Sequence, residues 1–478
     1  MSTGIVSLPP GFRIALDPGT REVAPGVWSG GSPTRVVRLT ASGRAAWQRL
    51  ADGPVDSRAT GRLARWLTDA GLAHPCPPPA APGVDDVTIV IPVRDRVTLL
   101  DRCLAALDDR YPVVVVDDGS RAPAAVAAVA AAHGARLVAR PTNGGPSAAR
   151  NTGLDDVTTD LVAFVDSDCV PSKGWIERLA GHFADPMVAA VAPRVTALAG
   201  AGVAGRYARA AGSLDMGGQP AGVAPKTRVS YVPTVALIAR RKALRAVARP
   251  TGVFDAAMSI GEDVDLVWRL HRGGWRIRYD PSVRVGHHEP TTWPALLGRR
   301  LRYGTSAAPL AQRHPRNIPP LVLYPGPALT VAALMTGHLV AAAAAFAHSV
   351  HTTSRTLRER DLPVRGAVRT NVINVYETWL GVGRYATQYA APVILGLMLA
   401  GGRARWGRRA ALASLLVGPP LAAWVSRRPP IDPLRFTAAA VADEVAYGAG
   451  VWAGCLRQRT TMPLRPTIGR PAGKRGTP

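Results

Sequence analysis

The feature that most limits the fold of this chain is a run of five apolar residues followed by two closely spaced acids. The run is 161–165, and Asp166, Ser167 and Asp168 follow it directly. A short, wholly apolar run is typical of a strand buried on both faces of a parallel sheet. Ligands of open α/β sheets bind beyond the carboxyl ends of such strands. Acidic pairs are common in turns, but two carboxylates at that place also suit a divalent ion that holds a diphosphate.

Before this motif, apolar runs alternate with segments of helical pattern. Strands and helices that alternate at this spacing predict a Rossmann-like α/β domain, in which right-handed crossovers join a mainly parallel sheet. The predicted strands cover residues 87–93, 113–120, 135–139 and 160–168, and the predicted helices cover 98–107, 124–132 and 145–154.

Three of the predicted strands end in acidic residues that would meet at one edge of the sheet. They end in Arg94-Asp95, in Asp117-Asp118 and in the Asp-Ser-Asp motif. One acidic strand end is ordinary, whereas three in succession indicate a shared crevice. A carboxylate at Asp117 or Asp118 can accept a hydrogen bond from the imide N–H of uracil, which cytosine lacks.

A glycine-containing turn opens the third predicted helix. Asn143 and Gly144 stand just before a helix N-terminus, where backbone N–H groups and the helix dipole suit a phosphate or a ribose. Arg150, on the same helix, can reach a phosphate or hold an acidic loop in place. The sequence contains no G-x-G-x-x-G or Walker motif, which disfavours NAD and ATP.

Four ordered motifs resemble those of the family-2 glycosyltransferases, which have the GT-A fold. They are Val-Ile-Pro-Val-Arg-Asp, Val-Val-Asp-Asp-Gly-Ser, Gly-Gly-Pro-Ser-Ala-Ala-Arg-Asn-Thr-Gly and Phe-Val-Asp-Ser-Asp, and the resemblance covers residues 87–288. It implies an inverting enzyme that uses a UDP-sugar together with Mn²⁺ or Mg²⁺. It places the nucleotide-sugar contacts at Pro92, Arg94, Asp95, Asp117, Asp118, Gly119, Asn143, Gly144, Arg150 and Asp166.

A second acidic pair, Glu262-Asp263, stands near the start of a predicted helix over 259–270. From the residues alone, Ser259 can cap this helix with Glu262 as its capping-box partner, and the acids compensate for the helix dipole. The family resemblance implies that Asp263 is the catalytic base and that Glu262 orients it or an acceptor hydroxyl. Inversion needs one carboxylate that takes the proton of the acceptor hydroxyl. Asp265 is expected to be structural.

A predicted strand over 283–288 ends in two histidines. A single histidine at such a place is usually structural, but in related GT-A enzymes one often approaches the metal or the diphosphate. The resemblance therefore assigns His287 to the metal site beside Asp166 and Asp168, with His288 as the alternative.

Two stretches bear on the acceptor. Residues 195–229 are irregular and rich in Gly and Ala, which suits an acceptor-binding loop, and 230–240 is predicted as a strand leading to a helix. The segment 299–303 is similar to the Gln-x-x-Arg-Trp segment of chain-extending synthases but departs from it. Repeated sugar addition therefore stays open.

Residues 1–82 are predicted to form a small α+β domain and a linker ahead of a catalytic domain over 83–315. A strand is expected over 35–39, a helix capped by Thr40 or Ser42 follows, and a second helix covers 57–70. This pattern suggests a winged-helix-like domain, similar to the peptide-recognition domains of ribosomal-peptide modification systems, with a plain structural cap as the alternative. The proline-rich residues 75–82 predict a stiff linker.

The positive charge is concentrated in the last third of the chain. The net charge is +25, yet acids outnumber bases over 84–186, and most of the excess lies after residue 290. Because that third is also apolar, an anionic membrane surface is the expected partner. The chain lacks signatures of aromatic and basic residues that bind RNA, so no nucleic-acid partner is expected.

Residues 316–478 are predicted to form a membrane-associated helical region with a disordered basic tail after residue 460. Residues 317–354 contain no Asp, Glu, Lys or Arg and are long enough to span a bilayer, with a hairpin or a re-entrant segment as the alternatives. Shorter uncharged runs, 385–402 and 410–426, flank a basic turn, and 434–458 predicts a further helix despite its glycines. The start of the chain lacks signal-peptide features and the four cysteines are scattered, so the catalytic domain is expected to face the cytoplasm at the cell membrane.

The whole layout resembles one branch of the family, the mycofactocin-system glycosyltransferases of actinobacteria. The likeness includes residues 30–39 and 442–452 and extends over nearly the full length. It implies transfer of glucose from UDP-glucose to mycofactocin or its precursor, a peptide-derived redox cofactor, and growth of a β-linked oligosaccharide. A family-2 transferase that acts on a polyprenyl phosphate or a cell-wall lipid is one alternative. A non-catalytic membrane scaffold that recruits a modified peptide is another, although the intact acids argue against it.

Overall fold

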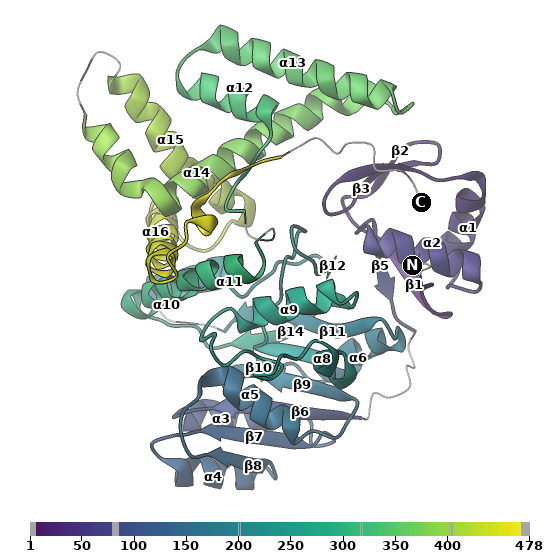
Figure 1. The fold of residues 1–478 in the computed structure, drawn as a ribbon, viewed down its shortest axis with the longest axis vertical. Coiled ribbons are helices and arrows are strands. Elements are labelled where there is room, and N and C mark those ends of the chain that lie inside the picture. Colours follow the sequence, from purple (N-terminus) through teal and green to yellow (C-terminus); the bar gives the residue numbers. More distant parts are fainter. Residues whose placement is uncertain are drawn as a thin grey trace. The chain divides into compact units, whose positions relative to one another are not determined.

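The chain forms two compact units (Figure 1). The first contains Met1–Leu198 and Gly212–Glu289, and the second contains Ala199–Ala211 and Pro290–Pro478. The structure, a computed structural model, describes residues 6–78, 86–198, 200, 202–315, 317, 319–400, 402 and 405–469. The predicted boundary between residues 315 and 316 differs from this division, because the helices just before it pack on the C-terminal helices.

A mixed sheet lies at the centre of the first unit (Figure 1). Its strand order is β10-β14-β11-β13-β9-β6-β7-β8, with β12 paired to β14. Strands β8, β7, β6 and β9 are parallel, β13 runs antiparallel between β9 and β11, and β11 is parallel to β14. The strands are β6 (Val87–Val93), β7 (Val113–Asp118), β8 (Arg136–Arg140), β9 (Leu161–Val165), β10 (Cys169–Pro171), β11 (Val188–Ala197), β12 (Ala221–Gly222), β13 (Ala236–Arg240) and β14 (Arg276–His287).

The parallel half of this sheet confirms the predicted α/β pattern. All five residues of β9 are buried, as its apolar run predicts. The helices that alternate with the strands are α3 (Val97–Ala105), α4 (Pro123–Ala132) and α5 (Gly145–Asp155). Branched strand residues such as Ile89, Ile91 and Val115 are fully buried in the core. Burying one such side chain contributes about 1.5–3 kcal/mol.

The other half was predicted less well. Strand β11 was not predicted, and residues 195–229 were predicted as one irregular loop. That stretch in fact contains the end of β11, the helix α7 (Gly202–Ala211) of the second unit, and β12. The strand predicted over 230–240 is confirmed only for β13, which α8 (Arg241–Ala246) follows.

Residues 6–78 form a small α+β part of the first unit, here called the leading module. Thr40 caps α1 by accepting a hydrogen bond from Gly43, and Ser57 caps α2 in a capping box with Thr60. These helices confirm the sequence prediction, while the winged-helix arrangement stays a prediction. The elements are β1 (Arg13–Leu16), β2 (Arg21–Ala24), β3 (Val27–Gly30), β4 (Arg35–Arg38), α1 (Ala41–Asp52), α2 (Arg58–Asp69) and β5 (Ala73–Cys76); β2-β3-β4 and β1-β5 pair antiparallel.

Two arginine–carboxylate pairs join the leading module to the catalytic sheet. Arg65 on α2 is fully buried, and its two terminal nitrogens each lie 2.7 Å from an oxygen of Asp185. Arg276 on β14 makes a second bidentate pair with Asp69. Breaking the buried Arg65–Asp185 pair would cost about 3–5 kcal/mol, whereas the more exposed Arg276–Asp69 pair contributes about 0–1 kcal/mol. The Arg65–Asp185 pair therefore supplies most of the attachment of the module. Most of the predicted linker, residues 79–82, lies outside the described residues.

The second unit is helical. The stretch 317–354 is broken at 336–338, so the hairpin alternative is confirmed: α12 and α13 pack on each other. In the described part of the chain, one helix, Trp406–Arg427, is long and apolar enough to cross a membrane. The helices of this unit, besides α7, are α10 (Trp293–Thr305), α11 (Ala307–Arg313), α12 (Pro325–Met335), α13 (Leu339–Arg358), α14 (Ala367–Leu399), α15 (Arg405–Arg427) and α16 (Pro433–Arg457).

Glycines allow close approach of the helices in this unit. A Cβ built on Gly450 of α16 would lie 1.9 Å from the carbonyl oxygen of Leu301 on α10, and one on Gly448 would lie 1.7 Å from that of Gln388 on α14. The glycines that weaken α16 locally are therefore its contact points. The disorder predicted after residue 460 is wrong for 461–469, which contains η3 (Met462–Leu464) and β16 (Thr467–Ile468). Residues 470–478 lie outside the described part.

Candidate active site

The polar ends of β6, β7 and β9 meet at one edge of the parallel half-sheet. Val93 pairs with Asp117 across β6 and β7, and Val90 pairs with Phe164 across β6 and β9. Because the carboxyl ends of parallel strands share an edge, the residues that follow them gather there, as the sequence predicts. The turn after β7 also meets the glycine turn, since a Cβ on Gly119 would lie 2.8 Å from the backbone nitrogen of Asn143.

Asp118 holds the glycine turn in place. One of its carboxylate oxygens accepts hydrogen bonds from Gly144 N at 2.9 Å and Arg140 Nε at 2.8 Å, and the other accepts one from Gly145 N at 2.7 Å. The side chain is buried and its hydrogen-bonding capacity is largely used. We therefore assign Asp118 a positioning role rather than a contact with a nucleotide base.

Asp117 is the better candidate for such a contact. Its Oδ1 accepts a hydrogen bond from Ser120 N at 3.0 Å, and within the described part of the chain its Oδ2 has no hydrogen-bond donor. The neighbouring Asp95 links two loops: its backbone N donates to Ser120 Oγ, and its carboxylate accepts from Arg121 N. Arg94 is exposed beside Asp95, while Pro92 lies within β6 and is half-buried.

Arg150 joins the Asp-Ser-Asp motif to the Glu262-Asp263 pair. The side chain is buried on α5, with Nη1 2.9 Å from Glu262 Oε1 and Nη2 2.6 Å from Asp166 Oδ1. Of the two roles predicted for Arg150, this geometry supports holding acidic groups in place. A cation between these carboxylates also reduces their mutual repulsion.

The helix that carries Asp263 starts differently from the prediction. Gly261, in the left-handed region with φ 86°, precedes α9 (Glu262–Arg272), and the helix has no side-chain cap. The predicted Ser259 cap and capping box are therefore wrong, because a glycine supplies a positive φ that other residues adopt only with strain. Asp265 is buried and pairs with two arginines, which supports its predicted structural role.

Asp263 is half-buried and has a raised pKa. Burial is the largest cause and Glu262 the next, and together they raise the pKa of Asp263 to about 7. Arg150 and the backbone N–H of Val264 act in the opposite sense. A carboxyl group that titrates near neutral pH is matched to general-base chemistry.

Strand pairing brings His287 to Asp168. Cys169 of β10 pairs with His287 of β14, so Nε2 of His287 lies 3.4 Å from Asp168 Oδ1, and Nδ1 lies 3.0 Å from Glu289 Oε1. Burial alone would raise the pKa of Asp168, but His287 and Arg96 outweigh it and lower this pKa. The alternative His288 contacts Asp168 through its backbone N–H.

The predicted metal site is only partly assembled. Asp166 is engaged by Arg150, and in the described ranges no group of three or more His, Cys, Asp or Glu side chains is arranged to hold a metal ion. The pair of Asp168 and His287 nevertheless fits one chemically, because carboxylate and imidazole are common ligands of divalent metals. The contact of His287 with Glu289 resembles the outer hydrogen bond that orients a metal-bound histidine.

Sequence reasoning missed three residues of this site. Arg96 pairs with Asp168, Arg140 pairs with Asp118, and Glu289 orients His287. The contact of Glu289 could have been predicted from the sequence, since Glu289 stands two residues after His287. The two arginines have none, because their partners are distant in sequence.

Comparisons with known proteins agree with the motifs. The model of glycosyl transferase family 2 matches residues 88–247. The pre-mycofactocin glycosyltransferase of Mycobacterium tuberculosis is 38% identical over 473 residues, which cover 96% of this chain and 98% of that protein. Glycosyltransferase AglE of Haloferax volcanii is 25% identical over 230 residues, 46% of this chain and 71% of that protein.

A search of solved structures gives a more distant likeness. The mannosyltransferase PcManGT from Pyrobaculum calidifontis, in complex with GDP-Man and Mn²⁺, is 19% identical, with a TM-score of 0.44 over 77% of this chain and 88% of that chain. The family-2 match, together with the observed sheet, confirms the predicted GT-A-like fold.

Proposed function

Because the chain belongs to the pre-mycofactocin glycosyltransferases of family 2, and so is a glycosyltransferase of the mycofactocin pathway, we propose that it transfers a hexose with inversion to mycofactocin or its precursor. The proposed donor is UDP-glucose, and the proposed product is a β-linked oligosaccharide. The observation that carries the proposal is the link from Asp166 through Arg150 to Glu262, directly beside Asp263.

The donor's nucleotide lies, in this proposal, over the ends of β6 and β7. The second carboxylate oxygen of Asp117 accepts the imide N–H of uracil, which would favour UDP over CDP donors. Asp118 supports this contact by holding the Asn143-Gly144 turn at the N-terminus of α5, where backbone dipoles favour a negative group. Arg94, exposed at the same edge, is the cation that we propose for the diphosphate.

The transfer step follows from the position of Asp263. Its carboxylate takes the proton of an acceptor hydroxyl, the freed oxygen forms a bond to C1 of the sugar, and the bond from C1 to the diphosphate oxygen breaks. UDP leaves on the opposite face, which inverts the configuration at C1. Arg150 keeps Glu262 in place beside Asp263, so the base is held ready for the acceptor.

Asp168 and His287 are the residues that we propose for a Mn²⁺ or Mg²⁺ ion, with Asp166 as the third candidate. When bound, such an ion offsets charge on the departing diphosphate. The contact of Glu289 with His287 Nδ1 favours the tautomer that leaves Nε2 available towards Asp168. We expect substitution of Glu289 by Gln to weaken metal binding more than substitution of His288 by Ala.

We also propose that the second unit lies on the cytoplasmic face of the cell membrane. Several of its large apolar side chains are exposed, among them Val340, Leu399 and Trp406. The excess of arginine after residue 290 suits an anionic surface. Flotation of the full chain with vesicles that contain anionic lipid tests this, and recovery only in the dense fraction at low salt would contradict it.

The test of the proposed reaction is a transfer assay with a panel of nucleotide sugars, Mn²⁺ or Mg²⁺, and the mature mycofactocin core. We expect the product to grow by hexose units from UDP-glucose and Asp263→Asn to abolish this growth. Asp101→Asn, at an exposed carboxylate, is the matched control and should keep full activity. Full activity of Asp263→Asn would exclude it as the base.

The same assay separates the lipid-acceptor alternative. Slow release of UDP without any glycosylated mycofactocin would support the proposed donor site but contradict mycofactocin as the acceptor. Polyprenyl phosphate and cell-wall lipid acceptors would then be tested next.

A further inference from the structure

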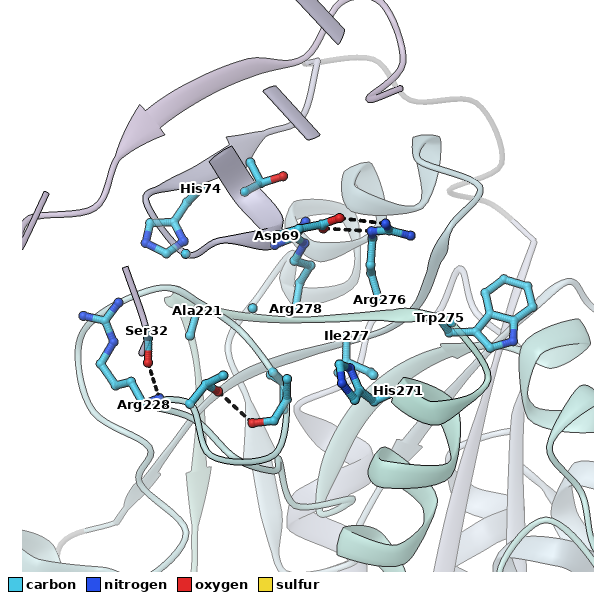
Figure 2. A pocket seen from close by; sticks show the side chains of 17 residues that line it. Ser32, Asp69, His74, Ala221, Arg228, His271, Trp275, Arg276, Ile277 and Arg278 are labelled. Carbon is cyan, nitrogen blue, oxygen red and sulfur yellow. Dashed lines mark hydrogen bonds and ion pairs between the residues drawn. The ribbon is translucent and has the colours of Figure 1, made fainter. Parts of the chain in front are cut away.

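A cavity of about 240 Å³ lies between the leading module and the strands β12 and β14 of the sheet. Figure 2 shows its labelled side chains, with Arg276 and Arg278 pointing from β14 towards the module. Asp69 and His74 of the module line one side, and residues from the end of α9 and from the loop after β12 line the others. All of these elements belong to the first unit.

Most of the charges around this cavity are paired. Asp17 pairs with both His74 and Arg228. The other two pairs are those that anchor the module, Arg276 with Asp69 and Arg65 with Asp185.

Arg278 is the exception. Its side chain lines the cavity and is only 3% exposed, yet within the described residues it makes no ion pair. Its Nε and Nη2 are buried without any hydrogen-bond acceptor. Burial lowers the pKa of Arg278 to about 10, with Asp69 and Asp185 acting in the opposite sense, so the side chain is still cationic at neutral pH. An unpaired buried charge is costly unless an opposite charge joins it.

We propose that this cavity binds a small molecule through one carboxylate, held by the guanidinium of Arg278. A guanidinium can donate two parallel hydrogen bonds to a carboxylate, which makes this pair strong and directional. With Arg278 unpaired, the side chains around the cavity carry one positive charge that no carboxylate offsets. A ligand with one negative charge would balance it, whereas a phosphate dianion would add one negative charge too many. Ile277, Val223 and Trp275 add apolar wall, which suits an apolar body on the ligand.

The cavity is separate from the candidate active site. Arg278 pairs with Val191 of β11, and His287 pairs with Ala197, six residues further along β11. This corresponds to about 20 Å of strand at about 3.3 Å per residue. Helix α9 connects the two places as well, since Glu262 starts it and His271 of its last turn lines the cavity. The inference therefore does not depend on the donor, the acceptor or the metal proposed above.

A ligand here would also clamp the leading module onto the sheet, because both contribute walls to the cavity. A molecule that binds the folded state alone raises the unfolding temperature as its concentration rises. Benzoate is a suitable probe, because it combines one carboxylate with a flat apolar body. Benzamide has nearly the same shape without the charge.

The experiment is a titration of the full chain with sodium benzoate at constant ionic strength, followed by calorimetry and by the thermal unfolding midpoint. We expect benzoate, but not benzamide, to bind and to raise the midpoint. Arg278→Met should weaken benzoate binding by about 10- to 100-fold, as for a lost hydrogen bond to a charged group. Without ligand, this variant should unfold no earlier than the wild type, because it removes an unpaired charge.

A second variant keeps the inference testable if Arg278→Met misfolds. Asp69→Asn releases Arg276 and gives the cavity a second unmatched cation, so it should bind benzoate more tightly than the wild type. Equal binding of benzoate and benzamide, or no loss with a folded Arg278→Met, would overturn the proposal. Tighter binding of inorganic phosphate than of benzoate would overturn the carboxylate assignment.

Discussion

The two compact units join their elements in different ways. In the first, buried arginines pair with carboxylates on distant elements, as Arg150 does with Asp166 and Glu262. In the second, such a pair also occurs, between Arg300 on α10 and Asp443 on α16, but helix backbones in addition approach each other at glycines, as α16 does at Gly448 and Gly450. A buried ion pair requires two particular side chains at one place, whereas a glycine contact requires only that a side chain be absent.

This difference matters for function. In the first unit the paired charges are the site itself, because they place acidic groups at the edge of the sheet where the diphosphate is proposed to lie. Close contacts of small residues are typical of helices that pack without a strong hydrophobic driving force, as in a lipid environment. The glycine contacts of the second unit therefore support the membrane association proposed above, and its described residues include one long apolar helix.

The largest effect is expected for Arg150→Met. The change leaves Glu262 and Asp166 without their cation, and breaking a buried pair costs about 3–5 kcal/mol. Denaturant unfolding measures this loss, and sugar transfer should fall with it because Glu262 is no longer held beside Asp263. Arg110→Met, at an exposed arginine that pairs with Asp108 and Glu177, is the control and should change stability by less than about 1 kcal/mol. An equally small loss of unfolding free energy in both variants would contradict the claim that buried ion pairs hold the first unit together.

The next effect is the pH dependence of transfer. The pKa of Asp263 is about 7, so the fraction of ionised base falls about tenfold for each pH unit below it. Initial rates should therefore be about 100-fold lower at about pH 5 than on the plateau above about pH 8. Rates that stay level over this range would contradict the assignment of Asp263.

The free energy of unfolding is expected to fall as the pH rises, whereas the rate of transfer rises. The pKa of Asp263 in the folded state lies well above the usual value of an aspartate, about 4. Between about pH 4 and pH 7 the folded state therefore binds more protons than the unfolded state. The contribution of this group to stability is present at low pH and is lost as the pH rises through about 7. Asp263→Asn should remove that slope, which unfolding curves at several pH values would measure.

Gly450→Ala probes the second unit. The added Cβ would lie 1.9 Å from the Leu301 carbonyl oxygen, so α10 and α16 must separate, and overpacking of this kind costs about 1–3 kcal/mol. The thermal unfolding midpoint should fall. An unchanged midpoint would mean that the contact between α10 and α16 is loose and that glycine has no special role there.

Local patterns were enough to predict much of the first unit. Strand β6 has the predicted limits, and Thr40, one of the two predicted candidates, caps α1. The helix predicted over 57–70 is α2. Each of these depends on residues close together in sequence, where periodicity and capping chemistry act directly. Strand β11 was missed because its sequence is rich in alanine and contains Pro193, both of which are poor strand signals.

The site could be predicted only in part. Strand ends indicated which acids would gather, but not which arginines would pair with them. Arg150 and Glu262 are 112 residues apart, and no local pattern marks such a contact. The Ser259 cap was wrong because a left-handed glycine takes its place. The glycines of α16 were predicted to weaken the helix, because the segments that contact them, on α10 and α14, are distant in sequence and no local pattern marks these contacts.

The smallest effect is expected for Gly407→Ala on α15, and its sign is opposite to that at Gly450. No atom lies within 4 Å of a Cβ built on Gly407, so nothing opposes the methyl group. Alanine costs less conformational entropy in a helix than glycine does, so the variant should be more stable by about 0.5–1 kcal/mol. Opposite shifts of the unfolding midpoint in the two variants would show that glycine is needed at helix contacts and not along the helices in general. A fall in both would mean that α15 has a close neighbour at Gly407, and the contrast between contact and free glycines would not hold.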